Sequence, residues 1–358
     1  MRVVCAMSGG VDSSVAAALM VEAGHEVIGM TMSLYDASID QKRGRGGTCC
    51  SPAEVDLARR ACDILGVPHY SVDERDRFQR EVIDDFVREY ASGRTPNPCA
   101  RCNEHVKFGP LLERARALGA ELLVTGHYAR IEDGGLHRGV DPGKDQSYFL
   151  FAMGQANLAK VHFPLGGWTK DEVRARAQAL GMPNWDAPDS QELCFVPGGD
   201  HGEVVERRAK ELGLDTSALA AGEILDEEGQ SLGEHRGIHR VTVGQRRGLG
   251  ISGERPRYVL RVLPESRSVV VGDPESLAVS TLEVEAFRAL ASVEHDVEFD
   301  AQVQFRHRAK AAPARVRISG NDARVEFLAP QRAAAPGQAV VVYDGDRVLG
   351  GGWLASAG

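Results

Sequence analysis

The first half of the chain alternates short apolar runs with longer segments of helical period, and this alternation constrains the fold more than any other feature. The apolar runs span residues 2–7, 25–32, 68–73 and 121–130, and the helical segments span 11–24, 52–66 and 75–93. This order predicts an α/β domain with a Rossmann-like parallel sheet and helices on both faces. Ligands of such sheets bind at the carboxyl ends of the strands. We expect two surface loops at that mouth, QKRGRGGTCCS (41–51) and TPNPCARCN (95–103).

The second half changes character after Cys194. A helix over 169–185, stopped by Gly181 and Pro183, precedes the change. The segments that then alternate in β fashion are 222–237, 239–251, 257–272, 281–287, 299–306, 314–328 and 337–353. We expect two smaller, mainly-β modules, a central β domain and a C-terminal β-barrel. The predicted domains are 1–195, 196–272 and 273–358.

Length and cysteine usage restrict the class of protein. A chain of 358 residues can bury several cores without disulfides or a structural metal. No apolar run approaches a membrane span and no signal-like core opens the sequence, so we expect a soluble cytoplasmic protein with no membrane partner. Seven cysteines are few and odd in number, which favours reduced thiols. Cys5 and Cys62 lie in apolar surroundings and are interpreted as small buried hydrophobes, whereas Cys49 and Cys50 match no motif.

The charge of the chain is unevenly distributed. The formal net charge is −9, but residues 232–261 carry seven Arg against two Glu, and 301–330 carry six Lys or Arg against two acids. Local basic surfaces on an acidic protein suit a phosphate-rich partner that is bound by one face. The alternative is a pair of solvated basic faces with no partner.

The segment AMSGGVDSS, residues 6–14, lies where the first strand ends and a helix begins. Gly9 and Gly10 allow backbone amides to approach a phosphate, and the helix N-terminus adds N–H groups and partial positive charge. Asp12, Ser13 and Ser14 can cap that helix. The segment is not a P-loop, because no Gly-Lys-Ser/Thr follows. An ordinary capped turn is the alternative.

Three cysteines outside the apolar runs carry candidate chemistry. Cys99 and Cys102 form a C-x-x-C in TPNPCARCN, and Cys194 lies in DSQELCFVPGG. Cys102 precedes a helical stretch, and a helix N-terminus favours a thiolate. Three interpretations compete: structural thiols, a zinc site completed by His105 or His127, and reactive cysteines that carry sulfur.

Six motifs together resemble one family. SGGVDSS is similar to the PP-loop of the ATP pyrophosphatases, and with TPNPxxxCN, TGHYAR, KDQSYFL, PDSQELCF and GQRRGLGI it follows the order found in bacterial tRNA-specific 2-thiouridylases. The resemblance continues through RYVLRV and PGQAVVVYDGD, so it covers most of the chain.

This resemblance implies an ATP-dependent tRNA-uridine 2-sulfurtransferase acting on the wobble uridine. ATP would activate C2 of the base through an O-adenylate, with Mg²⁺ neutralising the leaving pyrophosphate. A persulfide on Cys194 would deliver sulfur, and Cys102 would act as partner nucleophile and leave a Cys102–Cys194 disulfide. A cysteine desulfurase or a relay protein would supply the sulfur. We expect a monomer when the protein is free.

The resemblance also assigns site residues. The implied ATP-binding residues are Ala6, Met7, Ser8, Gly9, Gly10, Val11, Asp12, Ser13, Met32 and Gly126. The pocket for the flipped target base is implied at Asn97, Pro98 and Cys99. The implied tRNA contacts are His127, Lys144, Asp145, Gln146, Arg306, His307 and Gln338.

One position departs from the family pattern. The family motif reads TPNPD, whereas this chain has Cys99 in place of the aspartate, so the role of that carboxylate is in doubt here. Cys99, Cys102 and Cys194 could instead hold a [4Fe-4S] cluster with one open iron. A PP-loop amide-forming ligase and a non-catalytic adaptor that binds nucleotide or tRNA would also account for SGGVDSS, but neither gives the remote cysteines a task.

Overall fold

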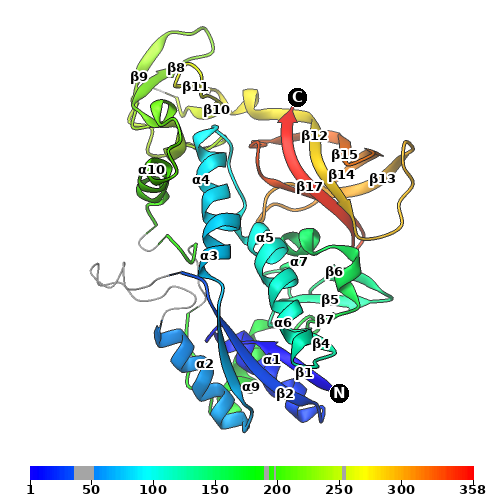
Figure 1. Ribbon diagram of the computed structural model, residues 1–358. Coiled ribbons are helices and arrows are strands. Elements are labelled where there is room, and N and C mark those ends of the chain that lie inside the picture. Colours follow the sequence, from blue (N-terminus) through cyan, green and yellow to red (C-terminus); the bar gives the residue numbers. More distant parts are fainter. Residues whose placement is uncertain (36–51, 189–192, 197–198, 252–254) are drawn as a thin grey trace. The chain divides into compact units, whose positions relative to one another are not determined.

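The computed structural model describes residues 1–35, 52–188, 193–196, 199–251 and 255–358 (Figure 1). The expected loop QKRGRGGTCCS, with Cys49 and Cys50, lies outside these residues. The described chain divides into two compact units. One comprises Met1–Val82, Cys99–Gly199 and Asp346–Val348, and the other comprises Ile83–Pro98, Asp200–Gly345 and Leu349–Gly358.

The first unit contains a five-stranded sheet in which every pairing is parallel, in the order β3-β2-β1-β4-β7. The strands are β1 (Arg2–Ala6), β2 (Glu26–Ser33), β3 (His69–Asp73), β4 (Leu122–Val124) and β7 (Val161–His162). The chain runs outward from β1 to β3 and then crosses to β4 on the other side of β1. The sheet therefore has a topological switch point between β1 and β4, as the strand–helix alternation predicts for a Rossmann-like fold.

Helices cover this sheet, and a hairpin follows β4. The helical elements are α1 (Val11–Glu22), α2 (Pro52–Leu65), α3 (Arg75–Phe78), the π-helical η3 (Gln79–Ile83), α6 (Leu112–Ala117), α7 (Ser147–Leu150), the 3₁₀ turn η5 (Phe151–Met153), α8 (Gln155–Leu158) and α9 (Lys170–Ala179). The hairpin consists of β5 (Ala129–Glu132) and β6 (Gly135–Arg138). Its two-residue turn has positive φ at both Asp133 and Gly134, as a type I′ turn requires.

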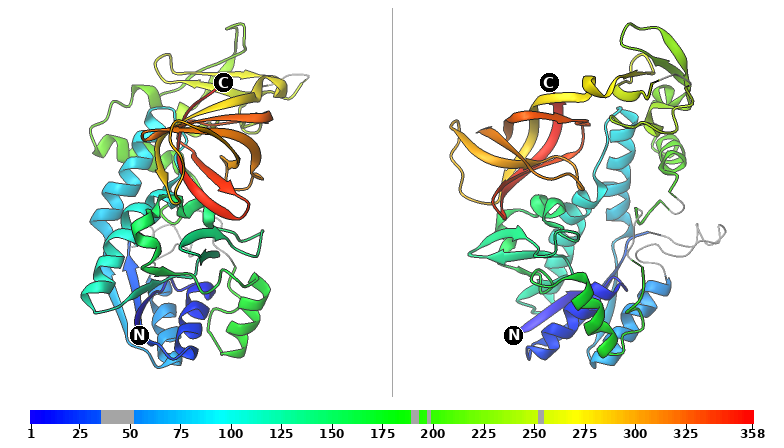
Figure 2. Two further views of the ribbon diagram at one scale, coloured as in Figure 1. Left: turned by 90° about the vertical axis from the view of Figure 1, so that its right-hand side faces the viewer. Right: turned by 180° about the vertical axis from the view of Figure 1, so that it is seen from behind.

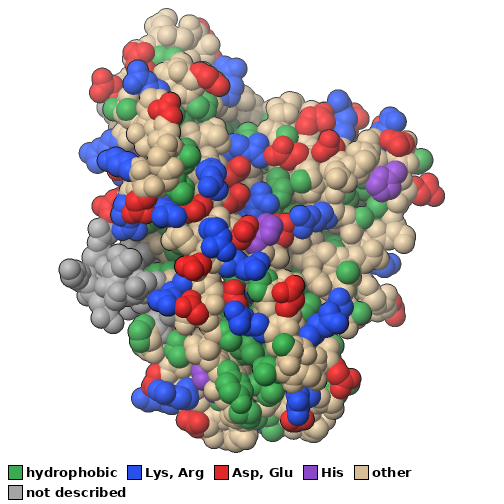
Figure 3. All heavy atoms as spheres, viewed as in Figure 1, with side chains coloured by type: hydrophobic (Ala, Val, Ile, Leu, Met, Phe, Trp, Pro, Cys, Tyr) green, Lys and Arg blue, Asp and Glu red, His purple; other side chains and the backbone are tan. Residues whose placement is uncertain are grey.

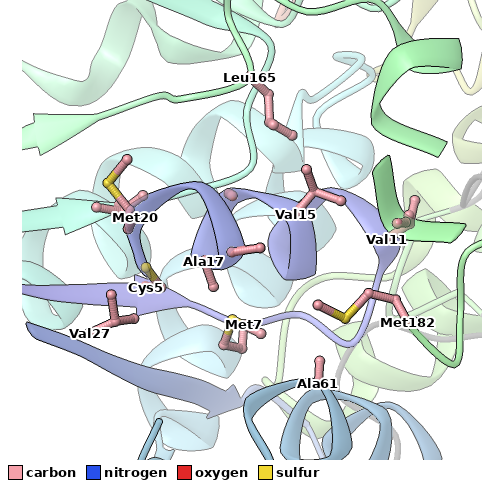
Figure 4. Close-up of a cluster of buried hydrophobic side chains, with 14 of the residues drawn as sticks. Cys5, Met7, Val11, Val15, Ala17, Met20, Val27, Ala61, Leu165 and Met182 are labelled. Carbon is pink, nitrogen blue, oxygen red and sulfur yellow. The ribbon is translucent and has the colours of Figure 1, made fainter. Parts of the chain in front are cut away.

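Alternate residues of β1 and of the position that follows it point into one core. Val3 and Cys5 of β1, with Met7 just after the strand, pack with the apolar faces of α1 and α2, as expected from the two-residue period of a strand (Figure 4). Cys5 and Cys62 are 1% and 0% exposed, so their interpretation as small buried hydrophobes is confirmed. Burial raises the pKa of Cys62 to about 11, and this thiol is therefore protonated near neutral pH.

The segment TPNPCARCN is only partly a loop. A helix begins at Pro98 with α5 (Pro98–Cys102), and it continues through the π-helical η4 (Asn103–Leu111) into α6. Proline at the first helical position is favoured because its missing N–H has no partner there anyway. The wide π turns contain Pro110, which cannot donate the usual helical hydrogen bond. The expectation of a surface loop is therefore wrong from Pro98 onward.

The second unit contains the two predicted β modules. The central module has a four-stranded sheet in the order β10-β11-β8-β9, formed by β8 (Gly222–Leu225), β9 (Ser231–His235), β10 (Tyr258–Leu263) and β11 (Ser268–Gly272). The second module closes into a barrel in the order β12-β15-β14-β13-β16-β17, because β12 also pairs with β17 (Figure 2). Its strands are β12 (Ala278–Ala289), β13 (Glu298–Gln304), β14 (Ala312–Ser319), β15 (Asp322–Arg332), β16 (Ala339–Asp344) and β17 (Arg347–Ala357).

Besides the β modules, the second unit contains α4 (Asp84–Ala91) and α10 (His201–Glu211), together with three 3₁₀ turns, η6 (Ser217–Leu219), η7 (Ile238–Arg240) and η8 (Pro274–Leu277). One expectation for this half is wrong. The predicted strand over 239–251 is absent from the described chain, which forms η7 and turns there. Gly244, Gly248 and Gly250 all have positive φ, so this backbone does not stay extended. No helix among the described residues is long and apolar enough to cross a membrane.

Candidate active site

The loop between β1 and α1 forms the centre of the candidate site. Gly9 has φ +82°, and a Cβ there would lie 2.4 Å from the Glu54 carbonyl oxygen, so only glycine fits. Gly10 is the N-cap of α1 and has extended backbone. The loop therefore places the N-terminus of a twelve-residue helix at the carboxyl end of β1, next to the switch point of the sheet. Backbone N–H groups in this arrangement form an anion site.

The hydroxyl groups of the loop bond within the loop. The Ser13 and Ser14 Oγ atoms donate to the Gly10 carbonyl oxygen at 2.9 and 3.2 Å, and the Ser8 backbone N–H donates to Ser13 Oγ at 3.2 Å. No side chain caps the helix through Gly10, so the expectation of capping by Asp12, Ser13 or Ser14 is wrong. All three lie inside the first turn, and the two serine hydroxyls bond back to the Gly10 carbonyl.

Asp12 forms a partly buried ion pair that no sequence motif predicted. Lys170 Nζ lies 2.8 and 2.9 Å from the two Asp12 carboxylate oxygens, and the Tyr128 hydroxyl donates to Asp12 Oδ1 at 2.7 Å. Lys170 is 6% exposed. The signals were present in the sequence, since Tyr128 lies in TGHYAR and Lys170 opens the helix TKDEV, but neither motif by itself shows a contact with Asp12.

The end of β4 packs against the same loop. A Cβ on Gly126 would lie 2.8 Å from Asp12 C and 2.9 Å from Ser13 N, so the backbone of TGHYAR touches the start of α1. Met32 is buried in β2, which pairs with β1. Gly126 thus contacts the loop in the fold, although the two are more than a hundred residues apart in the sequence.

His127 follows Gly126 and lies between aromatic rings. Its ring centroid is 5.9 Å from that of Phe108 and 5.8 Å from that of Phe163, and Nδ1 is 2.6 Å from Thr125 Oγ1. Burial, and to a smaller extent the charge of Lys107, hold the pKa of His127 well below its usual range. The imidazole is therefore neutral at neutral pH, which suits hydrogen bonding or stacking rather than ion pairing.

The KDQ residues bond largely within the first unit. Asp145 accepts from the Arg138 guanidinium at 2.8 Å and from the Gly139 and Ser147 backbone N–H groups at 3.1 and 3.0 Å. Gln146 Oε1 accepts from the Tyr128 N–H at 3.0 Å. These two side chains hold local structure, and Lys144 is half-buried beside them.

The cysteines occupy different environments. Cys99 is exposed on the first turn of α5, Cys102 is buried one turn later, and Cys194 is half-buried next to Phe195. The Phe195 ring meets that of Phe78 edge-on at 5.8 Å. Within the described residues, which include all three cysteines, no group of three Cys, His, Asp or Glu side chains could hold a metal ion. The zinc and iron–sulfur interpretations therefore have no support from the structure.

The remaining candidate residues lie in the second unit. Asn97 and Pro98 are buried at the start of α5. Arg306 and His307 are exposed in the turn after β13, and the Arg306 guanidinium lies 5.5 Å from the centre of the Phe305 ring. Gln338 donates to the Thr95 carbonyl oxygen at 2.9 Å, which gives its amide a structural task.

The fold and loop define a class of protein, the nucleotide-binding α/β domains with a PP-loop. A family profile described as tRNA methyl transferase HUP domain matches residues 1–198, and profiles described as its PRC-barrel domain and as an aminomethyltransferase β-barrel domain match 215–273 and 279–354.

Full-length relatives give the family itself. The chain is 50% identical to the tRNA-specific 2-thiouridylase MnmA of Geobacter metallireducens over 99% of this chain and 97% of the relative. It is 48% identical to the proteins of the same name from Rhodospirillum centenum and Acidothermus cellulolyticus, covering 99% of this chain and 92% and 98% of those proteins. The chain belongs to the tRNA-specific 2-thiouridylase family, as the sequence motifs indicated.

Solved structures match only distantly. A 4-thiouridine synthetase–RNA complex with bound ATP is 16% identical with a TM-score of 0.34, covering 59% of this chain and 51% of that chain. The likeness is thus confined to part of each chain.

Proposed function

We propose that this protein is an ATP-dependent sulfurtransferase that replaces the C2 oxygen of the wobble uridine in tRNA with sulfur. The observation that carries the proposal is the full-length likeness, at up to 50% identity, to proteins named tRNA-specific 2-thiouridylase. The PP-loop at the switch point of the sheet supports the proposal, because backbone N–H groups at a helix N-terminus suit the phosphates of a nucleoside triphosphate.

The first step activates the base. The uridine O2 attacks the α-phosphorus of ATP, and pyrophosphate leaves, so that O2 becomes part of an AMP leaving group. Backbone amides of residues 8–10 and the N-terminus of α1 would bind the phosphates, with Met32 and Gly126 completing the nucleotide pocket. Mg²⁺, bound largely by the phosphates themselves, would neutralise the leaving pyrophosphate.

The second step transfers sulfur. A donor protein, a cysteine desulfurase or a sulfur relay, would leave a persulfide on Cys194. Its terminal sulfur attacks C2 and AMP leaves. Cys102 then attacks Cys194 Sγ, which breaks the persulfide bond, releases the thiocarbonyl base and forms a Cys102–Cys194 disulfide. A dithiol reductant restores both thiols.

The tRNA would be bound by residues in both units. Asn97, Pro98 and Cys99 would line the pocket of the flipped base, and neutral His127 with Lys144, Asp145 and Gln146 would hold the anticodon region. Arg306, His307 and Gln338 would contact the tRNA body. We also propose the division into domains 1–195, 196–272 and 273–358, a monomeric free state and a cytoplasmic location.

Nucleoside analysis of tRNA tests the proposal. We expect purified protein with ATP, tRNA and a persulfide donor to form 2-thiouridine, and Cys194→Ala and Cys102→Ala to abolish it. Cys62→Ala is the matched control. The buried Cys62 thiol is protonated, so we expect the variant without it to retain activity. Full activity of Cys194→Ala would contradict the sulfur route.

Cys99 requires a separate experiment. Anaerobic purification with iron and sulfide analysis, combined with thiolation assays of Cys99→Ala and Cys99→Asp, tests whether this residue takes part. We expect protein without iron that is active in both variants. Stoichiometric iron and sulfide, lost with Cys99, would establish the cluster route instead.

A further inference from the structure

The helix α9 has no task in the reaction described above, yet its first residue reaches the PP-loop. Lys170 extends from the start of α9 to Asp12, and the two residues are 158 positions apart. The Lys170 side chain is 7% exposed and that of Asp12 is 32% exposed. Solvent therefore hardly reaches the lysine side chain but does reach part of the aspartate side chain.

Several contacts fix Lys170 in this place. Thr169 caps α9 in a capping box with Glu172, and the Lys170 backbone N–H donates to Asp141 Oδ2 at 3.0 Å. The ammonium also lies 5.9 Å from the centre of the Tyr128 ring, whose hydroxyl bonds to Asp12. A lysine with its backbone and ammonium both held in this way is pre-organised rather than flexible.

The charge balance of the loop explains why a lysine is needed. The segment MSGGVDSS contains one carboxylate and no cation, unlike a P-loop with its own lysine. An uncompensated Asp12 would repel the phosphates of ATP, because like charges at short distance disfavour binding. Lys170 places a positive charge within hydrogen-bond distance of this carboxylate.

We propose that Lys170 is a positioning residue for ATP, which orients and neutralises Asp12 so that the PP-loop can accept the triphosphate. The proposal rests on the proposed function, because it concerns the same nucleotide site. It predicts an effect on ATP binding that is separate from sulfur transfer by the cysteines.

Calorimetric titration of the full-length protein with MgATP tests this role. We expect Lys170→Met to raise the Kd for ATP by about tenfold or more, since removing one partner leaves a partly buried charge alone. Lys170→Arg keeps the charge and should bind ATP more tightly than Lys170→Met. Wild-type affinity in Lys170→Met would overturn the proposal.

The control lies on the same helix. Arg176 of α9 pairs with Glu22 of α1 at 2.5 Å, and both side chains are more than a third exposed. Arg176→Gln therefore removes another ion pair between these two helices, away from the loop, and should leave the Kd unchanged. An equal loss of affinity in Arg176→Gln would show a general effect of helix packing and overturn the proposal.

A double variant covers the case in which Lys170→Met folds poorly. Lys170→Met combined with Asp12→Asn removes both charges, and we expect its Kd to be no weaker than that of Lys170→Met alone. Independent, additive losses from the two substitutions would overturn the proposal. Thiolation by the wild type is measured in parallel, so a failure of the proposed function is distinguished from a failure of this inference.

Discussion

Gly9 and Gly126 are far apart in the chain, yet each is required by the same loop. Gly9 needs positive φ and space against Glu54, whereas Gly126 lets the end of β4 touch the backbone of Asp12 and Ser13. The nucleotide loop is therefore shaped from outside as well as by its own glycines.

Gly126→Ala should damage this contact. The added Cβ would overlap backbone atoms at 2.8 and 2.9 Å, so we expect a loss of roughly 1–3 kcal/mol in unfolding free energy and weaker ATP binding. Urea denaturation and ATP titration measure the two effects. Gly167→Ala is the control, because its Cβ would have nothing within 4 Å. Equal stability of both variants would contradict the packing argument.

The depressed pKa of His127 predicts a pH dependence of stability. The unfolded chain takes up a proton below the usual histidine pKa of about 6.5, whereas the folded imidazole stays neutral until lower pH. The contribution of His127 is thus fully present above that pH and is lost as the pH falls.

Thermal unfolding of His127→Asn between pH 5 and pH 8 measures this contribution. We expect the wild type to lose its advantage over the variant as the pH falls, and exposed His295→Asn to show no such convergence. Parallel curves for wild type and His127→Asn would contradict the argument.

Residue roles were predictable only where a motif carries them. SGGVDSS indicated the loop and its glycine turn, because the backbone geometry follows from residue type. The Asp12–Lys170 pair was not predictable, since it depends on how α9 packs against α1. The same holds for Asn184, whose amide donates to the Gly9 carbonyl oxygen from the turn beyond α9.

At the scale of elements, the N-terminus of α9 determines the position of the side chain that pairs with Asp12. Its N-terminus holds Lys170, and its capping box is complete, with Thr169 Oγ1 accepting from the Glu172 N–H. An intact first turn is therefore a condition for the position of the lysine.

Thr169→Ala should weaken both the helix and the loop. Loss of an N-cap lowers the unfolding free energy by about 0.5–2 kcal/mol, and we expect a smaller rise in the Kd for ATP than in Lys170→Met. Thr216→Ala is a control, because Thr216 precedes a 3₁₀ turn without a side-chain cap bond. Chemical denaturation of both variants measures the unfolding free energy. A Thr169→Ala variant as stable as the wild type would contradict this prediction.

The kind of element was predictable for most of the chain, and the two failures have different causes. In the barrel, β14 alternates strictly, since its residues are buried and exposed in turn. The stretch 239–251 also contains apolar residues at intervals, but its glycines take positive φ. The helix α10 (His201–Glu211) was not predicted because no element was assigned to the sequence between Cys194 and residue 222, although this stretch has helical period.

On the scale of the whole molecule, charge is mixed rather than uniform. Acidic and basic side chains are interspersed on the face shown in Figure 3. The turn after β13 differs, because basic side chains gather there within a few residues. Arg306, His307, Arg308 and Lys310 are all exposed. Because the chain is acidic overall, such a local cluster favours a phosphate contact at one place.

Salt dependence of tRNA binding tests this cluster. We expect the double variant Arg306→Ala, Arg308→Ala to weaken binding and to reduce the slope of log K against log salt by about one to two. Arg324→Gln is the control, because its guanidinium already pairs with Glu283 at 3.0 Å. An unchanged slope in the double variant would remove this turn from the tRNA interface.

The assignment of α4 to the second unit has a consequence for synthesis on the ribosome. Asp84 pairs with Arg208 at 2.8 Å, and the Tyr90 ring stacks on His201 at 4.9 Å. Arg208 is translated 124 residues after Asp84, which at about 5–20 residues per second is a delay of roughly 6–25 s. During that interval the buried side of α4 lacks its native contacts with α10, so we expect chaperones to bind this helix in the newborn protein.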